Sequence, residues 1–275
     1  LRALAARLGA AFPYPNPLWD KRRNPAITPI REALVGDQRT GLLATLVAMA
    51  VILLIGCANV AALLLVRAGA PVLVHGVTSD PGRITTAEVL AALGVPASPD
   101  HAQAEAAMAR GEAAFLPIAS LAPRLSWMLS LRRVLGVRNS THTLVKIMQP
   151  FAGPALRLVS YTHPEYLEML GEYFLTASDP ARGDAFLMRG TEGETVANAN
   201  KAQQIDWFHG VERTVLVEKQ LLVEELPHLP AERDAATTAT WIAAVLRGEV
   251  PVPPSIAGQV EQCLTTARQI AARPR

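Results

Sequence analysis

An uncharged run of 26 residues, from Gly41 to Val66, constrains this chain more than any other feature. A helix of that length is about 39 Å long, which exceeds the ~30 Å hydrocarbon layer of a bilayer. Arg39 precedes the run and Arg67 follows it, as charged residues do at the two ends of a membrane-spanning helix. The run predicts a membrane-spanning helix at residues 41–66. A pair of consecutive helices buried in a protein core is the alternative.

The sequence around this run carries a family resemblance. Residues 31–68, REALVGDQRTGLLATLVAMAVILLIGCANVAALLLVRA, resemble the start of a transmembrane helix in MacB/FtsX-type ABC transporter permeases. The resemblance implies a permease-like segment at residues 1–67 and contact with a membrane through residues 41–66. The chain contains no GxxxxGK[ST] nucleotide-binding loop, so a transporter ATPase is not expected.

The balance of basic and acidic residues changes at the end of the same segment. Residues 1–68 hold eight Lys and Arg against three acids, whereas residues 69–275 hold 18 against 21. The two parts therefore differ in sign as well as in hydrophobic pattern, which predicts a second domain at residues 68–275. Only two cysteines occur, Cys57 and Cys263, so neither a disulfide framework nor a cysteine metal site is expected.

From Pro71 onward, short apolar runs alternate with helical patterns. The runs predict strands at residues 71–76, 113–118, 155–161, 184–190 and 213–218. Helices are predicted at residues 85–94, 121–136, 140–150, 164–177 and 234–247, with a further one near the C-terminus. Thr85 or Thr86 is the expected N-cap of the first, and Gly94 its end. Such alternation indicates an α/β domain with a largely parallel sheet, whose ligands bind at the carboxyl ends of the strands.

The loop HGVTSDPGRITT, residues 75–86, lies at such a strand end. It offers hydroxyl, glycine and cationic groups in front of a helix N-terminus, which is a setting that favours phosphate. The candidate binding residues are His75, Gly76, Ser79 and Arg83. The alternative is an ordinary loop whose Thr and Ser cap the next helix, with His75 in a structural hydrogen bond.

Three stretches together resemble the anthranilate phosphoribosyltransferase group of glycosyltransferase family three. They are VLVHGVTSDPGRITTAEVLAALG, FLPIASLAPRLSWMLSLRRVLGVRNSTHTLVKIMQPF and RGTEGE, and the resemblance covers residues 63–270. Within this group, the three stretches are most similar to the YbiB-type branch, which is described as DNA-binding. The resemblance implies a nucleoside phosphorylase/phosphoribosyltransferase-like sheet with flanking helices, a homodimer and a cytoplasmic location for this domain.

The same resemblance assigns roles residue by residue. The family's KHGNRS motif is matched at His75, Gly76 and Ser79, but its Lys, Asn and Arg are replaced. Arg132 is the counterpart of an arginine that contacts an aromatic carboxylate acceptor. Glu192 and Glu194 loosely match an acidic motif that holds Mg²⁺ beside phosphoribosyl pyrophosphate, the alternative being a solvated loop. The family's GTGGD pyrophosphate loop is absent, so normal phosphoribosyl transfer is not expected.

Residues 113–164 contain six Lys and Arg and no acid, which predicts a positive face. Its candidate nucleic-acid contacts are Arg132, Arg133, Arg138 and Lys146, and solvated helix faces are the alternative. We expect a protein that binds single- or double-stranded nucleic acid without sequence specificity and has weak or no transferase activity. The alternatives are a transferase that uses phosphoribosyl pyrophosphate, Mg²⁺ and an unknown acceptor, and a permease fragment. Both families that the chain resembles have an LLLxR pattern, which occurs here at residues 63–67. We therefore also expect the chain to be a chimera in which a permease-like segment and a phosphoribosyltransferase-like domain are joined there.

Overall fold

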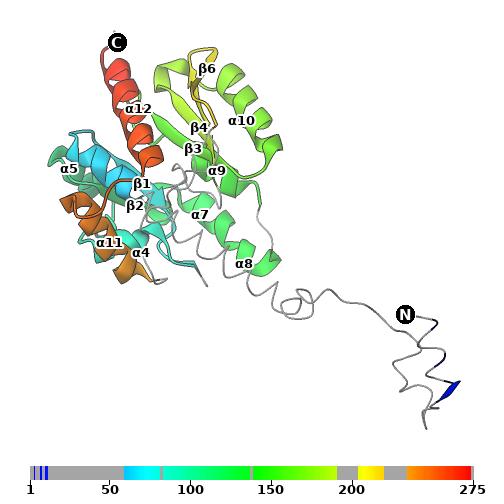
Figure 1. Ribbon diagram of the computed structural model, residues 1–275. Coiled ribbons are helices and arrows are strands. Elements are labelled where there is room, and N and C mark those ends of the chain that lie inside the picture. The colour runs from blue at the N-terminus through cyan, green and yellow to red at the C-terminus, as the bar shows by residue number, and fades with distance from the viewer. Residues whose placement is uncertain are drawn as a thin grey trace. The chain divides into compact units, whose positions relative to one another are not determined.

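The computed structural model describes residues 59–80, 83–136, 139–190, 204–219 and 234–273, together with isolated helical positions at Ala3, Arg7, Ala10 and Ala11. The chain divides into two compact units, Leu1–Ala48 and Met49–Arg275. All helices and strands labelled in Figure 1 belong to the second unit.

The strands of this unit form two sheets. In the first sheet, β1 (Leu73–Gly76) pairs in parallel with β2 (Ala114–Pro117). The second has the order β3-β4-β5-β6, with bounds of Arg157–Tyr161, Ala185–Arg189, Ile205–His209 and Glu212–Val217. Only β3 and β4 pair in parallel there, since β5 is antiparallel to both β4 and β6. Both sheets are short and are connected through helices.

The described residues of this unit include nine α-helices from Thr86 onward. They are α4 (Thr86–Ala92), α5 (His101–Ala109), α6 (Ile118–Leu121), α7 (Pro123–Ser130), α8 (Arg132–Leu135), α9 (Thr141–Ile147), α10 (Pro164–Thr176), α11 (Ala235–Arg247) and α12 (Pro254–Ala271). Residues 59–67 are helical as well.

The four-stranded sheet packs against helices on both of its faces. On one face, Leu187 and Phe208 pack with Phe174 of α10. On the other, Phe186 and Met188 share a core with residues of α11 and α12. Figure 1 shows the same arrangement, with α10 and α12 on opposite sides of β3 and β4. Successive β4 side chains therefore alternate between two cores, as the pleat of a strand requires.

The helix ends follow their expected capping chemistry. Thr85 is the N-cap of α4 and forms a capping box with Glu88, which confirms one of the two predicted caps. Gly94, just after α4, has a φ of +83°, as expected for a glycine that ends a helix. Asp234 caps α11 by accepting a hydrogen bond from the Thr237 backbone N–H, 2.7 Å away.

All five predicted strands are present, but the prediction of a largely parallel sheet was wrong for β5 and β6, which form an antiparallel hairpin. The predicted single helix at residues 121–136 is interrupted. Ala122 adopts φ −147° and ψ 79° because the ring of Pro123 disfavours a helical conformation in the preceding residue. Neither α5 nor β5 was predicted from the sequence.

The end of the predicted membrane-spanning run has a different environment from the one expected. Val60, Ala61 and Leu65 are buried in the same core as β4 and α12. These uncharged side chains are thus covered by protein, as in the alternative of a buried helix. No helix in the described part of the chain is both long and apolar enough to cross a membrane. The remainder of the permease-like segment, apart from the four isolated positions, lies outside the described residues.

Candidate functional site

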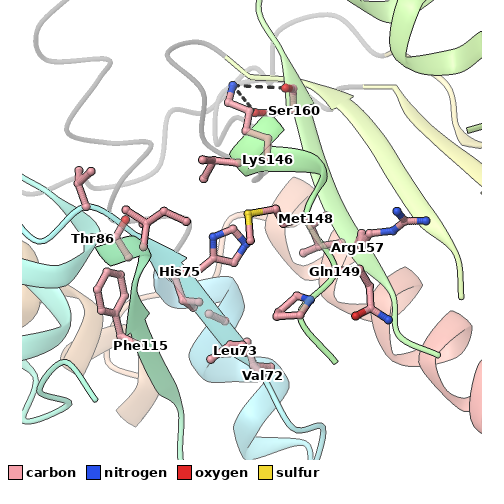
Figure 2. A pocket seen from close by; sticks show the side chains of 18 of the residues that line it. Val72, Leu73, His75, Thr86, Phe115, Lys146, Met148, Gln149, Arg157 and Ser160 are labelled. Atoms are coloured by element: carbon pink, nitrogen blue, oxygen red, sulfur yellow. Dashed lines mark hydrogen bonds between the residues drawn. The ribbon is translucent and has the colours of Figure 1, made fainter. Parts of the chain in front are cut away.

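A cleft of about 1500 Å³ opens between the end of β1 and the edge of β3. The loop after β1 lines one side of it, and α7, α8 and α9 contribute further walls. Figure 2 shows β1 and β3 on opposite sides of this space, with His75 of β1 directed into it. The cleft therefore lies at the strand end where the sequence placed a ligand site.

His75 projects from β1 into the cleft, and its ring points towards Met148 (Figure 2). Its Nδ1 atom is buried and has no hydrogen-bond partner among the described residues. Burial lowers the pKa of His75 below its ordinary value of 6.5, since an imidazolium loses its hydration there. His75 is accordingly a neutral side chain at pH 7. The alternative interpretation, a structural hydrogen bond of His75, finds no support at Nδ1 within the described part of the chain.

The loop that follows His75 is held by its own hydrogen bonds. The Arg83 N–H donates to the Asp80 carbonyl over 3.1 Å, and the Thr85 hydroxyl donates to the Thr78 carbonyl over the same distance. Ser79 and Arg83 both line the cleft within this folded loop. The role of Thr85 is that of a cap, as the alternative interpretation of the loop expected.

The helix α8 reaches back to this loop through an ion pair. Arg132 Nη1 lies 3.4 Å from Asp80 Oδ2, and both side chains are partly exposed. Arg133 follows on the same short helix and also lines the cleft. Two segments 52 residues apart in sequence are thereby brought to one wall of the site.

On the β3 side, Lys146 of α9 extends towards Ser160. Its Nζ atom donates to the Ser160 hydroxyl at 3.3 Å and to the Ser160 carbonyl at 3.4 Å, as the dashed lines of Figure 2 show. The ammonium group is partly buried rather than extended into solvent. Lys146 thus positions one positive charge beside β3.

The electrostatic balance of the lining is strongly positive. One carboxylate, Asp80, belongs to the described lining, against six cations: Arg83, Arg132, Arg133, Lys146, Arg157 and Arg273. The last two have structural roles. Arg273 binds both carboxylate oxygens of Asp184 at 2.6 Å. Arg157 donates to Ser178 and stacks over Phe174, and its burial lowers its pKa.

The predicted site residues that the structure describes converge on this cleft. His75, Gly76, Ser79, Arg83, Arg132, Arg133 and Lys146 all line it. Arg138, Glu192 and Glu194 lie outside the described residues. The sequence reasoning overlooked Asp80 as the partner of Arg132. The sequence contained a signal for this ion pair, because Asp80 is the one acidic residue in the predicted phosphate-binding loop.

The described lining does not fit a magnesium site. Mg²⁺ takes oxygen ligands, above all carboxylates. Asp80 is the one carboxylate in the described lining, and it already pairs with Arg132. Within the described ranges, no three His, Cys, Asp or Glu side chains form a group that could hold a metal. The described residues therefore supply no place for a metal-bound pyrophosphate.

Comparison with solved structures identifies the architecture. The chain superposes on anthranilate phosphoribosyltransferase from Thermus thermophilus with a TM-score of 0.58 and 22% identity, covering 77% of this chain and 63% of that one. The fold is that of anthranilate phosphoribosyltransferase. The predicted α/β class and phosphoribosyltransferase-like fold are thereby confirmed.

Sequence comparison gives two relatives. The chain is 41% identical over 212 residues to the uncharacterized protein YbiB of Escherichia coli K12, a match that covers 76% of this chain. It is 32% identical over 105 residues to the anthranilate phosphoribosyltransferase of Synechococcus sp. JA-3-3Ab. The chain spans 64% of the length of the first relative and 30% of the second. No protein-family model matches the chain.

Proposed function

We propose that this cleft binds the phosphate backbone of nucleic acid without reading its base sequence, and that the chain has weak or no transferase activity. One observation carries the proposal: besides Arg157 and Arg273, which have structural roles, the described lining of the cleft holds four Lys and Arg side chains against a single carboxylate. Nucleic-acid phosphates are recognised mainly by such a concentration of cations, whatever the net charge of the whole domain.

The distribution of the cations suits an extended polyanion. Arg83 lies on the loop after β1, Arg132 and Arg133 on α8, and Lys146 on α9, so that charge is spread over three segments of the wall. The cleft volume of about 1500 Å³ also exceeds the ~300–1000 Å³ of a typical small-molecule pocket. A polymer with phosphates at regular intervals can contact several of these cations at once.

The sequence also lacks groups that a transferase of this fold would use. It has no Gly-Thr-Gly-Gly-Asp stretch, and Val74, Val77 and Thr78 stand where the resembled enzymes have Lys, Asn and Arg. The apolar side chains of Val74 and Val77 offer no hydrogen bond to a sugar phosphate. These replacements support binding over group transfer.

Fluorescence anisotropy tests the proposal. A labelled 20-nucleotide strand and its duplex, each of mixed sequence, are titrated with the chain at 50 mM and 200 mM salt. We expect binding to both probes, with little dependence on base sequence and a loss of affinity of at least tenfold at the higher salt concentration. Absence of binding at 50 mM salt, or affinity that is unchanged at 200 mM, contradicts the proposal.

Phosphoribosyl transfer is the second candidate, favoured by the 105-residue similarity to a named anthranilate phosphoribosyltransferase. The chain is incubated with phosphoribosyl pyrophosphate, Mg²⁺ and a panel of aromatic carboxylates, and released pyrophosphate is measured. Our proposal expects no release above the rate without protein. Release that requires an acceptor and is abolished in His75→Ala would instead establish this activity.

A further inference from the structure

An exposed apolar surface lies on α7 and α8 at the rim of the cleft. The side chain of Trp127 is 64% exposed, and Met128 beside it is 39% exposed. Val134 and Leu135 continue the surface on α8 with 82% and 58% exposure. We call these four residues the α7–α8 surface. A large exposed aromatic side chain is costly to leave in water, which makes this surface a candidate for binding.

Trp127 lies next to the cleft lining along α7. Ser126, Leu129 and Ser130 of the same helix line the cleft. The Ser130 hydroxyl donates to the Trp127 carbonyl over 2.6 Å, and the two residues are three positions apart, so they are neighbours on the helix surface. Trp127 itself is not among the lining residues, so it lies just outside the cleft, about one helical turn from Ser130.

Two exposed arginines lie close to Trp127 along the chain. Arg124 lies three residues before Trp127 on the helix, and Arg133 is exposed on the adjoining α8. No acid occurs between Glu112 and Glu165 in the sequence, so α7, α8 and α9 carry positive charge alone. The α7–α8 surface thus combines an aromatic face with arginines, which is the composition of sites that bind single strands.

We propose that Trp127 is a stacking platform for a base of single-stranded nucleic acid whose phosphates occupy the cleft. This inference rests on the proposed function and narrows its ligand class. A base in a single strand exposes its π-face to an indole, whereas a base within a duplex is already stacked on its neighbours. The cleft cations bind phosphates of either form, and Trp127 adds affinity for the unpaired one.

Charge complementarity favours this occupant over a protein. The cores of protein interfaces are depleted in charge. Here Arg132 and Arg133 stand in the chain between the two apolar pairs of the α7–α8 surface, and Arg124 flanks it. A polyanion carries a phosphate at each nucleotide and can therefore pair with several of these arginines at once.

The experiment compares a 20-nucleotide thymidine strand with a mixed-sequence duplex. It uses wild type, Trp127→Ala, Trp127→Phe and the control Met169→Ala, whose side chain is exposed on α10 outside the cleft lining. We expect Trp127→Ala to weaken binding of the strand by about fivefold to a hundredfold and duplex binding by less than twofold. Trp127→Phe keeps most of the affinity, and Met169→Ala matches wild type. The strand also quenches tryptophan emission of the wild-type chain, and this quenching is lost in Trp127→Phe.

Three results would overturn the inference. The first is single-strand affinity of Trp127→Ala equal to that of wild type. The second is an equal loss for strand and duplex. The third is a change from dimer to monomer in sedimentation velocity for both Trp127→Ala and Leu135→Ala with strand binding intact, which would assign the α7–α8 surface to a second copy of the chain. The proposed function is tested separately. It stands in each of these cases if wild type binds in a salt-sensitive manner and Arg132→Ala/Arg133→Ala weakens that binding.

Discussion

Arg132 and Asp80 form an ion pair that ties α8 to the loop after β1, with 3.4 Å between Nη1 and Oδ2. Both side chains are partly exposed, so the pair contributes at most about 1 kcal/mol to stability. Its larger effect is on the cleft, where Asp80 cancels one of the positive charges. The carboxylate also holds the guanidinium against the loop rather than in the open space of the cleft.

Asp80→Asn therefore strengthens nucleic-acid binding. Removal of the single carboxylate in the described lining leaves Arg132 available to a phosphate. We expect affinity for a 20-nucleotide strand to rise about threefold at 100 mM salt and the slope of log K against log salt to steepen by about 0.7. Anisotropy titrations at four salt concentrations measure both quantities. An unchanged slope would show that Asp80 does not compete with the ligand.

Gly183 is required by its backbone conformation and by a close contact. Its φ is +94°, and a Cβ at this position would stand 2.2 Å from the Ala155 carbonyl oxygen. We expect Gly183→Ala to lower the free energy of unfolding by about 3 kcal/mol. Gly258→Ala is the matched control, because Gly258 lies within α12 with open space around it, and that change should stabilise by up to ~1 kcal/mol. Urea unfolding measures both, and equal effects at the two glycines would refute the assignment.

Asp184 connects the C-terminal helix to the sheet. Its side chain is fully buried, accepts two hydrogen bonds from Arg273 and takes a third from Trp207 Nε1 at 2.9 Å. Arg273→Ala leaves this carboxylate buried without its cation, at a cost on the order of 3 kcal/mol. Arg268→Ala, an exposed change on the same helix, should cost under ~0.5 kcal/mol. A thermal shift no greater for Arg273→Ala than for Arg268→Ala would contradict this account.

The pH dependence of stability contains a contribution from His75. Burial lowers the pKa of His75 in the folded chain, so the unfolded chain, whose value is near 6.5, binds more protons as the pH falls. The folded state is therefore favoured fully above pH 6.5 and loses this contribution as the pH falls below it. In His75→Gln, the free energy of unfolding should decline less between pH 7.5 and 5.5 than in wild type. Parallel declines in urea unfolding at these two pH values would exclude the contribution.

The sequence predicted the fold correctly where secondary structure depends on residues that are close together in the chain. Capping residues such as Thr85 and Asp234 marked helix ends, and apolar runs marked five strands. It failed where the signal was weak: α5 has a single buried residue, Ala104, and so shows little helical periodicity. The missed β5 is a five-residue strand whose antiparallel pairing depends on contacts with both neighbours.

The candidate site was predicted more fully than the sheet. Loop position and residue type indicated His75, Ser79 and Arg83 as candidates, because ligands of α/β sheets bind at strand ends, and the structure places all three in the cleft lining. The convergence of Arg132 and Lys146 on the same cleft depends on how α8 and α9 pack, which no local pattern encodes. The unpaired Nδ1 of His75 was equally beyond the sequence, because only the packed structure shows what surrounds a ring.

The salt dependence of single-strand binding tests the central claim most directly. Wild type is compared with Arg132→Ala/Arg133→Ala and with Arg110→Ala/Arg247→Ala, whose arginines pair with Glu112 and Glu249 outside the cleft. Both variants change the net charge equally. We predict that the cleft variant reduces the magnitude of the slope of log K against log salt by about 0.7, because the lost Arg133 accounts for one phosphate contact on a single strand whereas Arg132 is already paired with Asp80. The control variant should keep the wild-type slope, and equal slopes for the two variants would contradict binding in the cleft.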